Sequence, residues 1–198
     1  MLRSLYTEAI ADTPEEAGEY GEMIVNSTIK TKFYKDVECH LFKDVYIEDN
    51  KGVHQIDHIF ILKTGIFVVE TKMFSNGKVI GDADDKIWVA LNGEHKTQFV
   101  NPIIQNETHV RVVKDLLDDE YDVNSVVVFA WGNKPRNCKS PIVLNYSEFL
   151  QYPLNFKPKK ELNSEDIKRI CDILNENEKK KPELKAKHKM LIKARRQQ

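Results

Sequence analysis

The chain has 198 residues, of which 41% are hydrophobic and 31% charged, which suits one α/β domain and excludes a globally disordered chain. Its longest apolar runs are far shorter than the ~18 residues of a membrane-spanning helix. The N-terminal segment turns acidic before an apolar stretch develops, so no secretory signal is expected. Three widely spaced cysteines argue against a disulfide framework or a cysteine-based zinc site. We therefore expect a cytoplasmic protein that does not enter a membrane.

Charge is distributed unevenly along the chain. The net charge is −1, but residues 179–198 carry +8 and leave −9 for residues 1–178. A basic segment on an acidic globule suits a polyanionic partner such as nucleic acid. The same segment is equally compatible with a solvated, frayed helix that only aids solubility. The candidate phosphate contacts are Lys179, Lys180, Lys181, Lys185, Lys187, Lys189, Lys193, Arg195 and Arg196.

A first helix is predicted over residues 14–30. Thr13 can cap this helix and Pro14 suits its first turn. Gly18 and Gly21 each weaken a helix by roughly 1 kcal/mol relative to alanine. We therefore expect close backbone packing, or approach to a functional site, at these glycines.

Short apolar runs with a period of two, typical of strands, begin after residue 36. Thr64-Gly65 is the expected turn between the second and third strands, and Asn92-Gly93 is a strong hairpin signal. The predicted strands span residues 38–47, 55–62, 66–72, 78–81, 86–91 and 95–99.

The remaining pattern predicts two helices and two further strands. Asn101-Pro102 opens a helix that ends near residue 118, and residues 163–175 form an amphipathic helix. Residues 125–131 are a continuous apolar run, as expected of a central strand buried on both faces, and residues 141–144 suggest another strand. The order predicts an α/β fold in which a mixed β-sheet is flanked by helices.

The third predicted strand places charged side chains on an apolar face. Residues two apart in a strand share a face, so Glu70 and Lys72 continue the face that carries Ile66 and Val68. Neither charge is cheap to leave unpaired in such a position.

The length of the preceding hairpin loop decides whether Asp57 joins this face. A two-residue loop at Thr64-Gly65 places Asp57 opposite Lys72 and Glu70 opposite Ile59, whereas an odd loop turns Asp57 away. We predict an even loop, which brings two carboxylates and a lysine together at the ends of two adjacent strands.

Paired carboxylates beside a lysine suit metal-assisted phosphodiester hydrolysis. Two nearby carboxylates repel each other unless a proton or cation lies between them. Mg²⁺ accepts one or two carboxylates and leaves its remaining positions to water and substrate phosphate. The alternative is structural: an ion pair between Asp57 and Lys72, with Glu70 solvated at a sheet edge. The short D…E-x-K pattern by itself favours that alternative, because such motifs recur by chance.

Several motifs follow one another over about residues 18–117. They are Gly18-x-x-Gly21-Glu22-x-x-Val25, Gln55-Ile56-Asp57-His58, Gly65-Ile66-Phe67-Val68-Val69-Glu70-Thr71-Lys72, Trp88, and Asn101-Pro102-x-x-Gln105-x-x-x-His109. In order and spacing, this set resembles the NERD (nuclease-related) domain family, which belongs to the PD-(D/E)xK nuclease superfamily. The proline that precedes the aspartate in the superfamily name is Ile56 here, a change that removes no chemical group.

The resemblance implies a restriction-endonuclease-like core and a role for each polar residue of these motifs. Asp57 and Glu70 would hold Mg²⁺ or Mn²⁺ together with the backbone carbonyl of Thr71. Lys72 would be the catalytic lysine. A further acid would come from Glu22 on the first helix, and Gln105 would line the site.

These implications predict a metal-dependent nuclease, with DNA favoured over RNA as its substrate. Residues 1–160 would form the nuclease-like domain, and residues 161–198 would add an amphipathic helix and a basic tail. A homodimer is one way to cut two strands. The sequence contains no phosphate-binding loop for ATP, so an ATP-driven step would need a separate partner. The alternative is a non-catalytic nucleic-acid-binding or adaptor module that retains the nuclease fold.

Other chemistry-bearing residues receive a structural interpretation. His54 and His58 lie four apart in a strand, about 13 Å, which is too far for two ligands of one zinc ion. His109 follows Gln105 by one helical turn and has two equally good readings, a phosphate contact or an ordinary helix histidine. Trp88 and Trp131 lie in apolar strands and are expected in the core.

Overall fold

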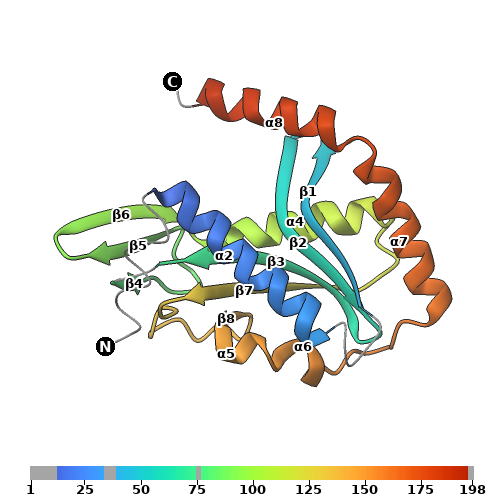
Figure 1. The fold of residues 1–198 in the computed structure, drawn as a ribbon, viewed down its shortest axis with the longest axis horizontal. Helices are drawn as coiled ribbons and strands as arrows, with labels where there is room; N and C mark the ends of the chain where they lie inside the picture. The colour runs from blue at the N-terminus through green and yellow to red at the C-terminus, as the bar shows by residue number, and fades with distance from the viewer. Residues whose placement is uncertain (1–12, 34–38, 75–76, 196–198) are drawn as a thin grey trace.

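A five-stranded mixed sheet runs through the centre of the molecule (Figure 1). The computed structural model describes residues 13–33, 39–74 and 77–195. The strand order is β1-β2-β3-β7-β8; the first three strands are antiparallel, and β3, β7 and β8 run parallel. The α/β fold with a mixed sheet flanked by helices is confirmed. The strands are β1 His40–Asp49, β2 Gly52–Leu62, β3 Gly65–Met73, β7 Val123–Trp131 and β8 Val143–Asn145.

Helix α2 (Pro14–Thr28) covers one face of the sheet. It begins with a capping box in which Thr13 and Glu16 exchange side-chain-to-backbone hydrogen bonds, as the predicted N-terminus requires. A short π-helix, η1 (Ile29–Phe33), continues it, and helices α5 (Tyr146–Phe149) and α6 (Tyr152–Asn155) lie on the same side. The core on this face includes the buried residues Val25, Ile29, Phe33, Phe60, Phe67, Val126, Val128 and Phe149.

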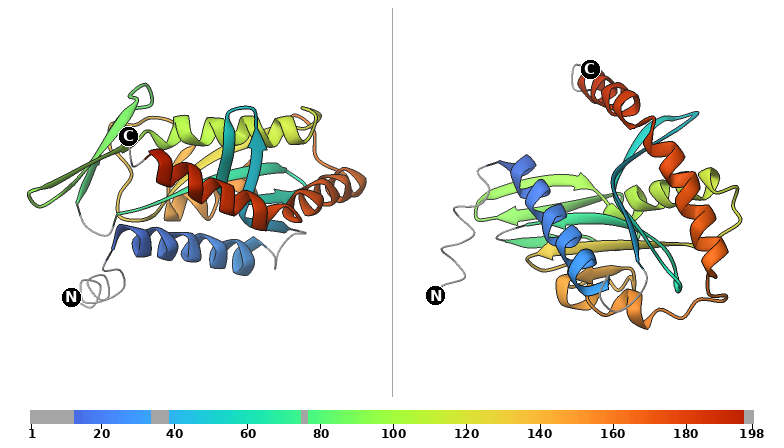
Figure 2. Two further views of the ribbon diagram at one scale, coloured as in Figure 1. Left: turned by 90° about the horizontal axis from the view of Figure 1, so that it is seen from above. Right: turned by 45° about the vertical axis from the view of Figure 1, so that its right-hand side comes forward.

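Helices α4 (Pro102–Leu116) and α7 (Ser164–Glu178) cover the other face (Figure 2). Asn101 and Asn163 cap their N-termini. Both residues stand at the predicted starts of these helices. Both helices contribute to the core that buries Ile59, Ile61, Ile66, Val68, Val112, Val113, Ile167, Ile170 and Leu174.

The predicted meander forms a separate three-stranded antiparallel sheet that extends from the end of β3. Its strands are β4 (Lys78–Ile80), β5 (Ile87–Asn92) and β6 (His95–Val100). Trp88 anchors this sheet: its ring is fully buried against Phe129 of β7, and its indole N–H donates to the backbone carbonyl of Asp82. The prediction that Trp88 lies in the core is confirmed, whereas it is wrong for Trp131, which is only half-buried at the end of β7.

The first two hairpins differ from the prediction, since β1 continues past residue 47 to Asp49 and β2 begins at Gly52 instead of residue 55. The β1–β2 turn is confined to Asn50-Lys51. The Asp49 carboxylate accepts hydrogen bonds from the backbone N–H groups of Lys51 and Gly52, and these bonds stabilise the short turn. The β2–β3 loop is Lys63-Thr64 instead of Thr64-Gly65, since Leu62 pairs with Gly65. Gly65 begins β3 with φ of 140°, a backbone conformation that favours glycine.

The even loop is confirmed, but the register differs from the prediction by two residues. His58 pairs with Val69, so the next residues on the two strands are Asp57 and Glu70. Asp57 therefore lies across from Glu70, and the predicted pairing with Lys72 is wrong. Asp57 still lies on the predicted face of the sheet, because the predicted and the observed β2–β3 loops both have two residues.

The basic C-terminal segment is not a free appendage. Residues Lys181–Arg195 form helix α8, which packs on β1 and β2 beyond the point where these strands leave the rest of the sheet (Figure 1). Leu184 is buried among Tyr46 and Val53 of the hairpin and the half-buried Leu191. Apolar contacts thus fix the helix, which excludes the frayed, solvated alternative for residues up to Leu191.

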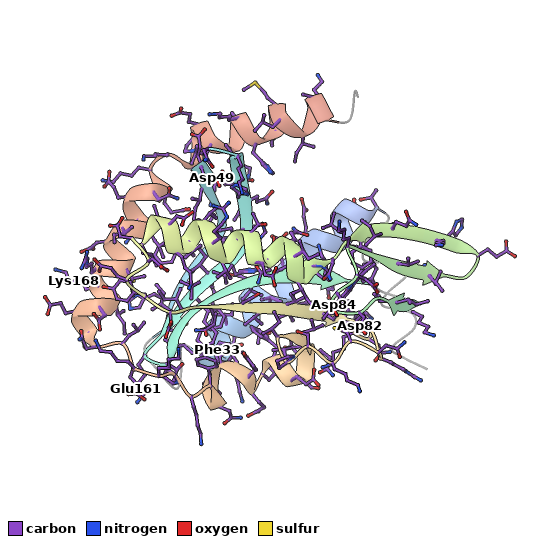
Figure 3. The ribbon with its side chains drawn as sticks, turned by 180° about the vertical axis from the view of Figure 1, so that it is seen from behind. Phe33, Asp49, Asp82, Asp84, Glu161 and Lys168 are labelled. Carbon is purple, nitrogen blue, oxygen red and sulfur yellow. The ribbon has the colours of Figure 1, made fainter. Side chains whose placement is uncertain are left out.

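The tip of the β1–β2 hairpin is also tied to α4. Arg111 of α4 donates to the Asp49 carboxylate at 2.6 Å, and His54 lies 2.9 Å from the other oxygen. Figure 3 shows Asp49 at this tip, beside α8. These contacts hold the pKa of Asp49 well below its usual range, mainly through the Arg111 hydrogen bond. The hairpin is therefore held from both sides.

Asn106 joins α4 to the sheet. Its buried amide nitrogen donates to the backbone carbonyls of Val68 in β3 and Val126 in β7 and to the hydroxyl of Ser125, at 2.9, 3.2 and 2.8 Å. These bonds set the rotation of α4 over the two central strands, so the neighbouring residue Gln105 and the next turn of the helix face the end of β3.

We expect Asn106→Ala to lower the free energy of unfolding by about 1–3 kcal/mol, because two buried carbonyls lose their shared donor. Equilibrium unfolding in urea measures the change. Glu107→Ala, at an exposed neighbouring position on the same helix, is the matched control. Equal stabilities for the two variants would contradict this account of α4.

Candidate functional site

The candidate site lies where β2 and β3 separate. The ladder between them ends at the His58–Val69 pair. One residue further, Asp57 accepts a hydrogen bond from the backbone N–H of Thr71 through Oδ2, at 2.7 Å. The Asp57 side chain thus replaces a backbone acceptor and sits between the diverging strands, next to Glu70. Sequence reasoning brought these two residues together correctly, although through a different register.

Glu70 and Lys72 meet on the face of β3 covered by α4. Lys72 Nζ donates to Glu70 Oε1 at 2.6 Å and to Gln105 Oε1 at 3.3 Å. The Glu70 side chain is only 3% exposed. Its other oxygen, Oε2, has no hydrogen-bond partner, and His109 Nδ1 lies 3.5 Å from it. Lys72 therefore satisfies Oε1 of the Glu70 carboxylate, and Oε2 remains available to a ligand.

Helix α2 brings Glu22 to the same place because Gly21 allows a close approach. A Cβ on Gly21 would stand 2.9 Å from Cβ of Met73 and 3.4 Å from the methyl carbon of Thr71. The expectation of close packing is confirmed at Gly21; at Gly18 no atom lies within 4 Å of a built Cβ, so it is wrong there. An alanine at position 21 would push α2, and Glu22 with it, away from β3.

The three carboxyl groups disfavour one another's ionisation. Burial, followed by repulsion from Glu70 and Glu22, raises the pKa of Asp57 well above its usual range. Burial likewise raises the pKa of Glu70, although Lys72 opposes this shift. The pKa of Glu22 rises to about 7, through burial first and then through the charges of Asp44 and Glu70. A cation placed among these groups would relieve the repulsion.

These observations fit a hard divalent cation. Asp57 and Glu70 supply two carboxylates within one small region, and Glu70 Oε2 is buried without a partner. Within the described residues, no three His, Cys, Asp or Glu side chains are grouped as a ready-made metal site. Mg²⁺ does not require three such side chains, because it is commonly held by one or two carboxylates with water and phosphate. The Thr71 backbone carbonyl is the predicted additional oxygen.

Two buried histidines flank the site. Burial and nearby positive charge lower the pKa of His109 to about 4, and burial together with Lys43 lowers that of His58 to about 4. Both rings are therefore neutral at pH 7, and neither Nδ1 has a hydrogen-bond partner. The sequence placed His109 one helical turn after Gln105, and the spacing does bring it to Glu70.

Asp44 is the residue that the sequence did not indicate. The β1–β2 pairs Lys43–His58 and Val45–Ile56 flank it, which places it across from Asp57, and its φ of 52° marks an irregularity in β1. Its carboxylate binds Lys185 Nζ at 2.7 Å and the amide of Gln55 at 2.9 Å. A local sequence pattern carries no signal for this role, because the partners of Asp44 come from distant segments.

The predicted nucleic-acid-binding lysines divide into two groups. Lys181 and Lys185 are tied to Asp44, Lys187 to Glu48, and Lys179 to Glu176, so much of the tail charge is paired within the molecule. A second group is exposed on α8 or just before it: Lys180, Lys189 and Lys193. The side chain of Arg195 and all of Arg196 lie outside the described residues.

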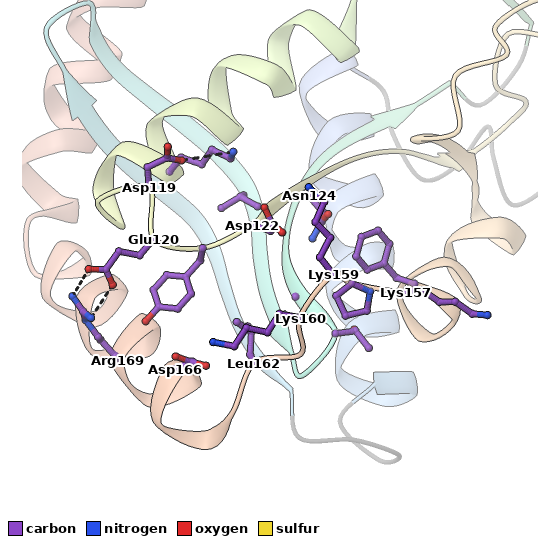
Figure 4. Close-up of a pocket in the computed structure, with 17 residues that line it drawn as sticks. Asp119, Glu120, Asp122, Asn124, Lys157, Lys159, Lys160, Leu162, Asp166 and Arg169 are labelled. Carbon is purple, nitrogen blue, oxygen red and sulfur yellow. Dashed lines mark hydrogen bonds and ion pairs between the residues drawn. The ribbon is translucent and has the colours of Figure 1, made fainter.

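Another cavity, of about 750 Å³, lies at the opposite end of the sheet, beside the β2–β3 loop (Figure 4). Four of its charged residues form ion pairs with one another, Arg169 with Glu120 at 2.8 Å and Lys114 with Asp119 at 3.7 Å. It contains none of the predicted site residues. The catalytic interpretation therefore rests on the β2–β3 separation and not on this cavity.

Comparison with known proteins agrees with the geometry. A family model described as a nuclease-related domain, NERD, matches residues 17–130. The chain belongs to the NERD family. Within the NERD segment lie Glu22, Asp57, Glu70, Lys72 and Gln105, and the PD-(D/E)xK superfamily placement is consistent with the fold.

A curated relative of this NERD protein is an uncharacterized protein of Bacillus anthracis. It is 31% identical over 116 residues, which cover 59% of this chain and 54% of the relative. The chain therefore spans about half the length of the relative it matches. No solved structure gives a significant match. Among the helices of residues 13–33, 39–74 and 77–195, none combines the length and hydrophobicity needed to cross a bilayer.

The raised pKa of Glu22 predicts a pH-dependent stability. The folded-state value of about 7 exceeds the ordinary 4.5, so the folded protein binds this proton more tightly than the unfolded chain. The resulting contribution to stability is full below pH 4.5 and is lost as the pH rises through 7. Relative to Glu22→Gln, the wild type should lose stability across this interval.

Urea unfolding of both proteins over that pH interval measures the difference. Glu107→Gln, at an exposed position on α4, is the control and should follow the wild type at every pH. A difference between wild type and Glu22→Gln that stays constant with pH would contradict the prediction.

Proposed function

We propose that this NERD protein is a Mg²⁺- or Mn²⁺-dependent nuclease that hydrolyses DNA phosphodiester bonds. The observation that supports this proposal most strongly is the convergence of Glu22, Asp57, Glu70 and Lys72 from α2, β2 and β3. Such convergence is costly to stability, since it gathers buried carboxylates with a single lysine. Cation ligands beside an ammonium group are suited to phosphodiester hydrolysis, since a bound cation polarises the phosphate and the ammonium group can orient a water.

In the proposed site, Asp57 and Glu70 hold the cation with the carbonyl of Thr71. The cation, when bound, would act as a Lewis acid that stabilises negative charge on the phosphate oxygens. Lys72 donates to Glu70 at 2.6 Å and to Gln105 at 3.3 Å, which leaves its third N–H donor to orient an attacking water or contact the phosphate. Gln105 limits the rotamers of Lys72, and Glu22 can accept a proton or position a second water.

The proposed organisation of the chain follows from the same residues. All five proposed catalytic residues fall in the predicted nuclease-like domain, residues 1–160. Residues 161–198 form an extension whose helices α7 and α8 pack against β1. We propose that this extension supports substrate binding instead of chemistry.

We expect Lys72→Ala to reduce metal-dependent DNA cleavage by roughly 10²–10⁴-fold, because the water or phosphate loses its proton-bearing partner. Plasmid and linear DNA, and RNA for comparison, are incubated with purified protein in Mg²⁺, Mn²⁺ or EDTA. Lys168→Ala, an exposed lysine on α7 (Figure 3), is the matched control and should cut normally. Retarded migration of DNA without cutting by the wild type would instead support a non-catalytic binding module.

Metal binding has its own test, separate from cleavage. At a concentration one hundred times its dissociation constant, a cation that binds only the folded protein adds about 2.7 kcal/mol to stability. We expect Mg²⁺ or Mn²⁺ to raise the unfolding midpoint of the wild type and to have little effect on Asp57→Asn or Glu70→Gln. A similar rise in all three proteins would argue against these ligands.

A further inference from the structure

A groove of about 430 Å³ adjoins the candidate catalytic site, between α2 on one side and the β1–α8 region on the other. Glu22 lines this groove and is also within electrostatic reach of Asp57 and Glu70. The groove thus borders the proposed site at Glu22. A polynucleotide whose phosphate is cut beside Asp57 must extend along a neighbouring surface, and this groove is a concave surface of suitable volume for part of it.

The α2 side of the groove presents hydrogen-bond acceptors. Glu19, Glu22 and Asn26 line it from successive turns of the helix. Oδ1 of Asn26 is buried and has no hydrogen-bond partner in the protein. Carboxylate and amide oxygens can accept hydrogen bonds from the amino group on the Watson–Crick edge of an unpaired base, such as cytosine.

The opposite side of the groove presents ammonium groups. Lys43 of β1 and Lys181 and Lys185 of α8 line it. Lys185 gives one hydrogen bond to Asp44, which leaves two of its three donors for a ligand. The groove therefore has acceptors on α2 and lysines on β1 and α8, and Asp44 lies on the lysine side, where it pairs with Lys181 and Lys185.

His58 supplies an independent sign that the groove has a ligand. Its side chain lines the groove and the residue is only 1% exposed, yet Nδ1 has no hydrogen-bond partner. A buried polar atom without a partner costs free energy that a bound ligand can recover. The neutral ring can donate to or accept from that ligand.

We propose that this groove binds one unpaired nucleotide next to the cleaved bond, with its phosphate toward Lys43, Lys181 and Lys185 and its base edge toward Glu19, Glu22 and Asn26. The substrate is therefore DNA that is single-stranded beside the cut. This inference rests on the proposed nuclease function, since that function identifies the ligand as a polynucleotide.

The need for an unpaired strand follows from the two sides of the groove. In a duplex, the pairing edge of each base is occupied by the opposite strand, and the phosphates lie on the outside. A nucleotide that offers its phosphate to one wall and its pairing edge to the facing wall cannot be base-paired at the same time. Met23, which lines the groove and is 51% exposed, supplies an apolar surface at its edge against which a base can pack.

The test measures binding without cleavage. Fluorescence anisotropy of labelled oligonucleotides is recorded with the full chain in EDTA, at mildly alkaline pH and several salt concentrations. The probes are a mixed-sequence single strand, the same sequence as a duplex, oligo(dC) and oligo(dT). We expect the single strand to bind at least about tenfold more tightly than the duplex. Oligo(dC) should bind about fivefold or more tightly than oligo(dT), because only cytosine presents an amino group.

Two variants probe the two sides of the groove. Lys43→Ala should weaken binding of every single strand and lower the salt slope by about one, since it removes one phosphate contact. Lys168→Ala, an exposed lysine far along α7, is the control and should change neither quantity. Asn26→Leu should remove the preference for oligo(dC) while oligo(dT) binding persists. If Asn26→Leu unfolds, Glu19→Met at an exposed position tests the same wall.

Each result decides the inference. It is overturned if the duplex binds as tightly as the single strand, if no oligonucleotide binds, or if Lys43→Ala behaves like Lys168→Ala. Binding in EDTA does not depend on catalysis, so the two proposals can fail separately. Cleavage by the wild type without these preferences would leave the nuclease proposal standing alone, and the preferences without cleavage would leave only the groove.

Discussion

The candidate site is defined by three carboxyl groups that repel one another and that the fold holds close together. Glu22, Asp57 and Glu70 come from α2, β2 and β3. Burial raises the pKa of each, and repulsion between carboxylates adds to the shifts of Asp57 and Glu22. Only one ammonium, on Lys72, bonds directly to a member of this group among the described contacts. The backbone N–H of Thr71 stabilises another member. The buried core around these groups offsets the free-energy cost of burying them, as is typical of functional sites.

Local sequence signals predicted most of the fold. The capping residues Thr13 and Asn101 marked helix starts correctly, and apolar alternation located the strands of both sheets. It was also predictable that the β2–β3 loop has an even number of residues, because only then do the apolar side chains of both strands face the same core. The register was not predictable, since moving a two-residue loop by one position changes the pairing by two residues and buries the same face. Convergence of Asp57 with Glu70 depended on parity alone, so it survived the error in register.

The parts that were not predictable depend on contacts between distant segments. Helix α8 is recognisable as a basic segment, but its position follows from Leu184 packing on Tyr46 and from Lys185 bonding to Asp44. A count of charges treats such lysines as free, whereas the structure pairs several of them with acidic residues of β1. Asp44 likewise gains its place near the site from the conformation of β1. Neither the packing of α8 nor the position of Asp44 follows from a periodic pattern or a motif in a single sequence.

The position of α8 has a consequence for how the chain is divided. The NERD segment ends at residue 130, yet one wall of the groove comes from Lys181 and Lys185. The proposed catalytic carboxylates and one wall of the proposed groove thus come from distant segments of the chain. Family members that share the matched segment but continue into a different downstream sequence would keep the same proposed reaction centre while facing it with another wall. Substrate preference could then diverge by exchange of C-terminal segments, without any change at the carboxylates.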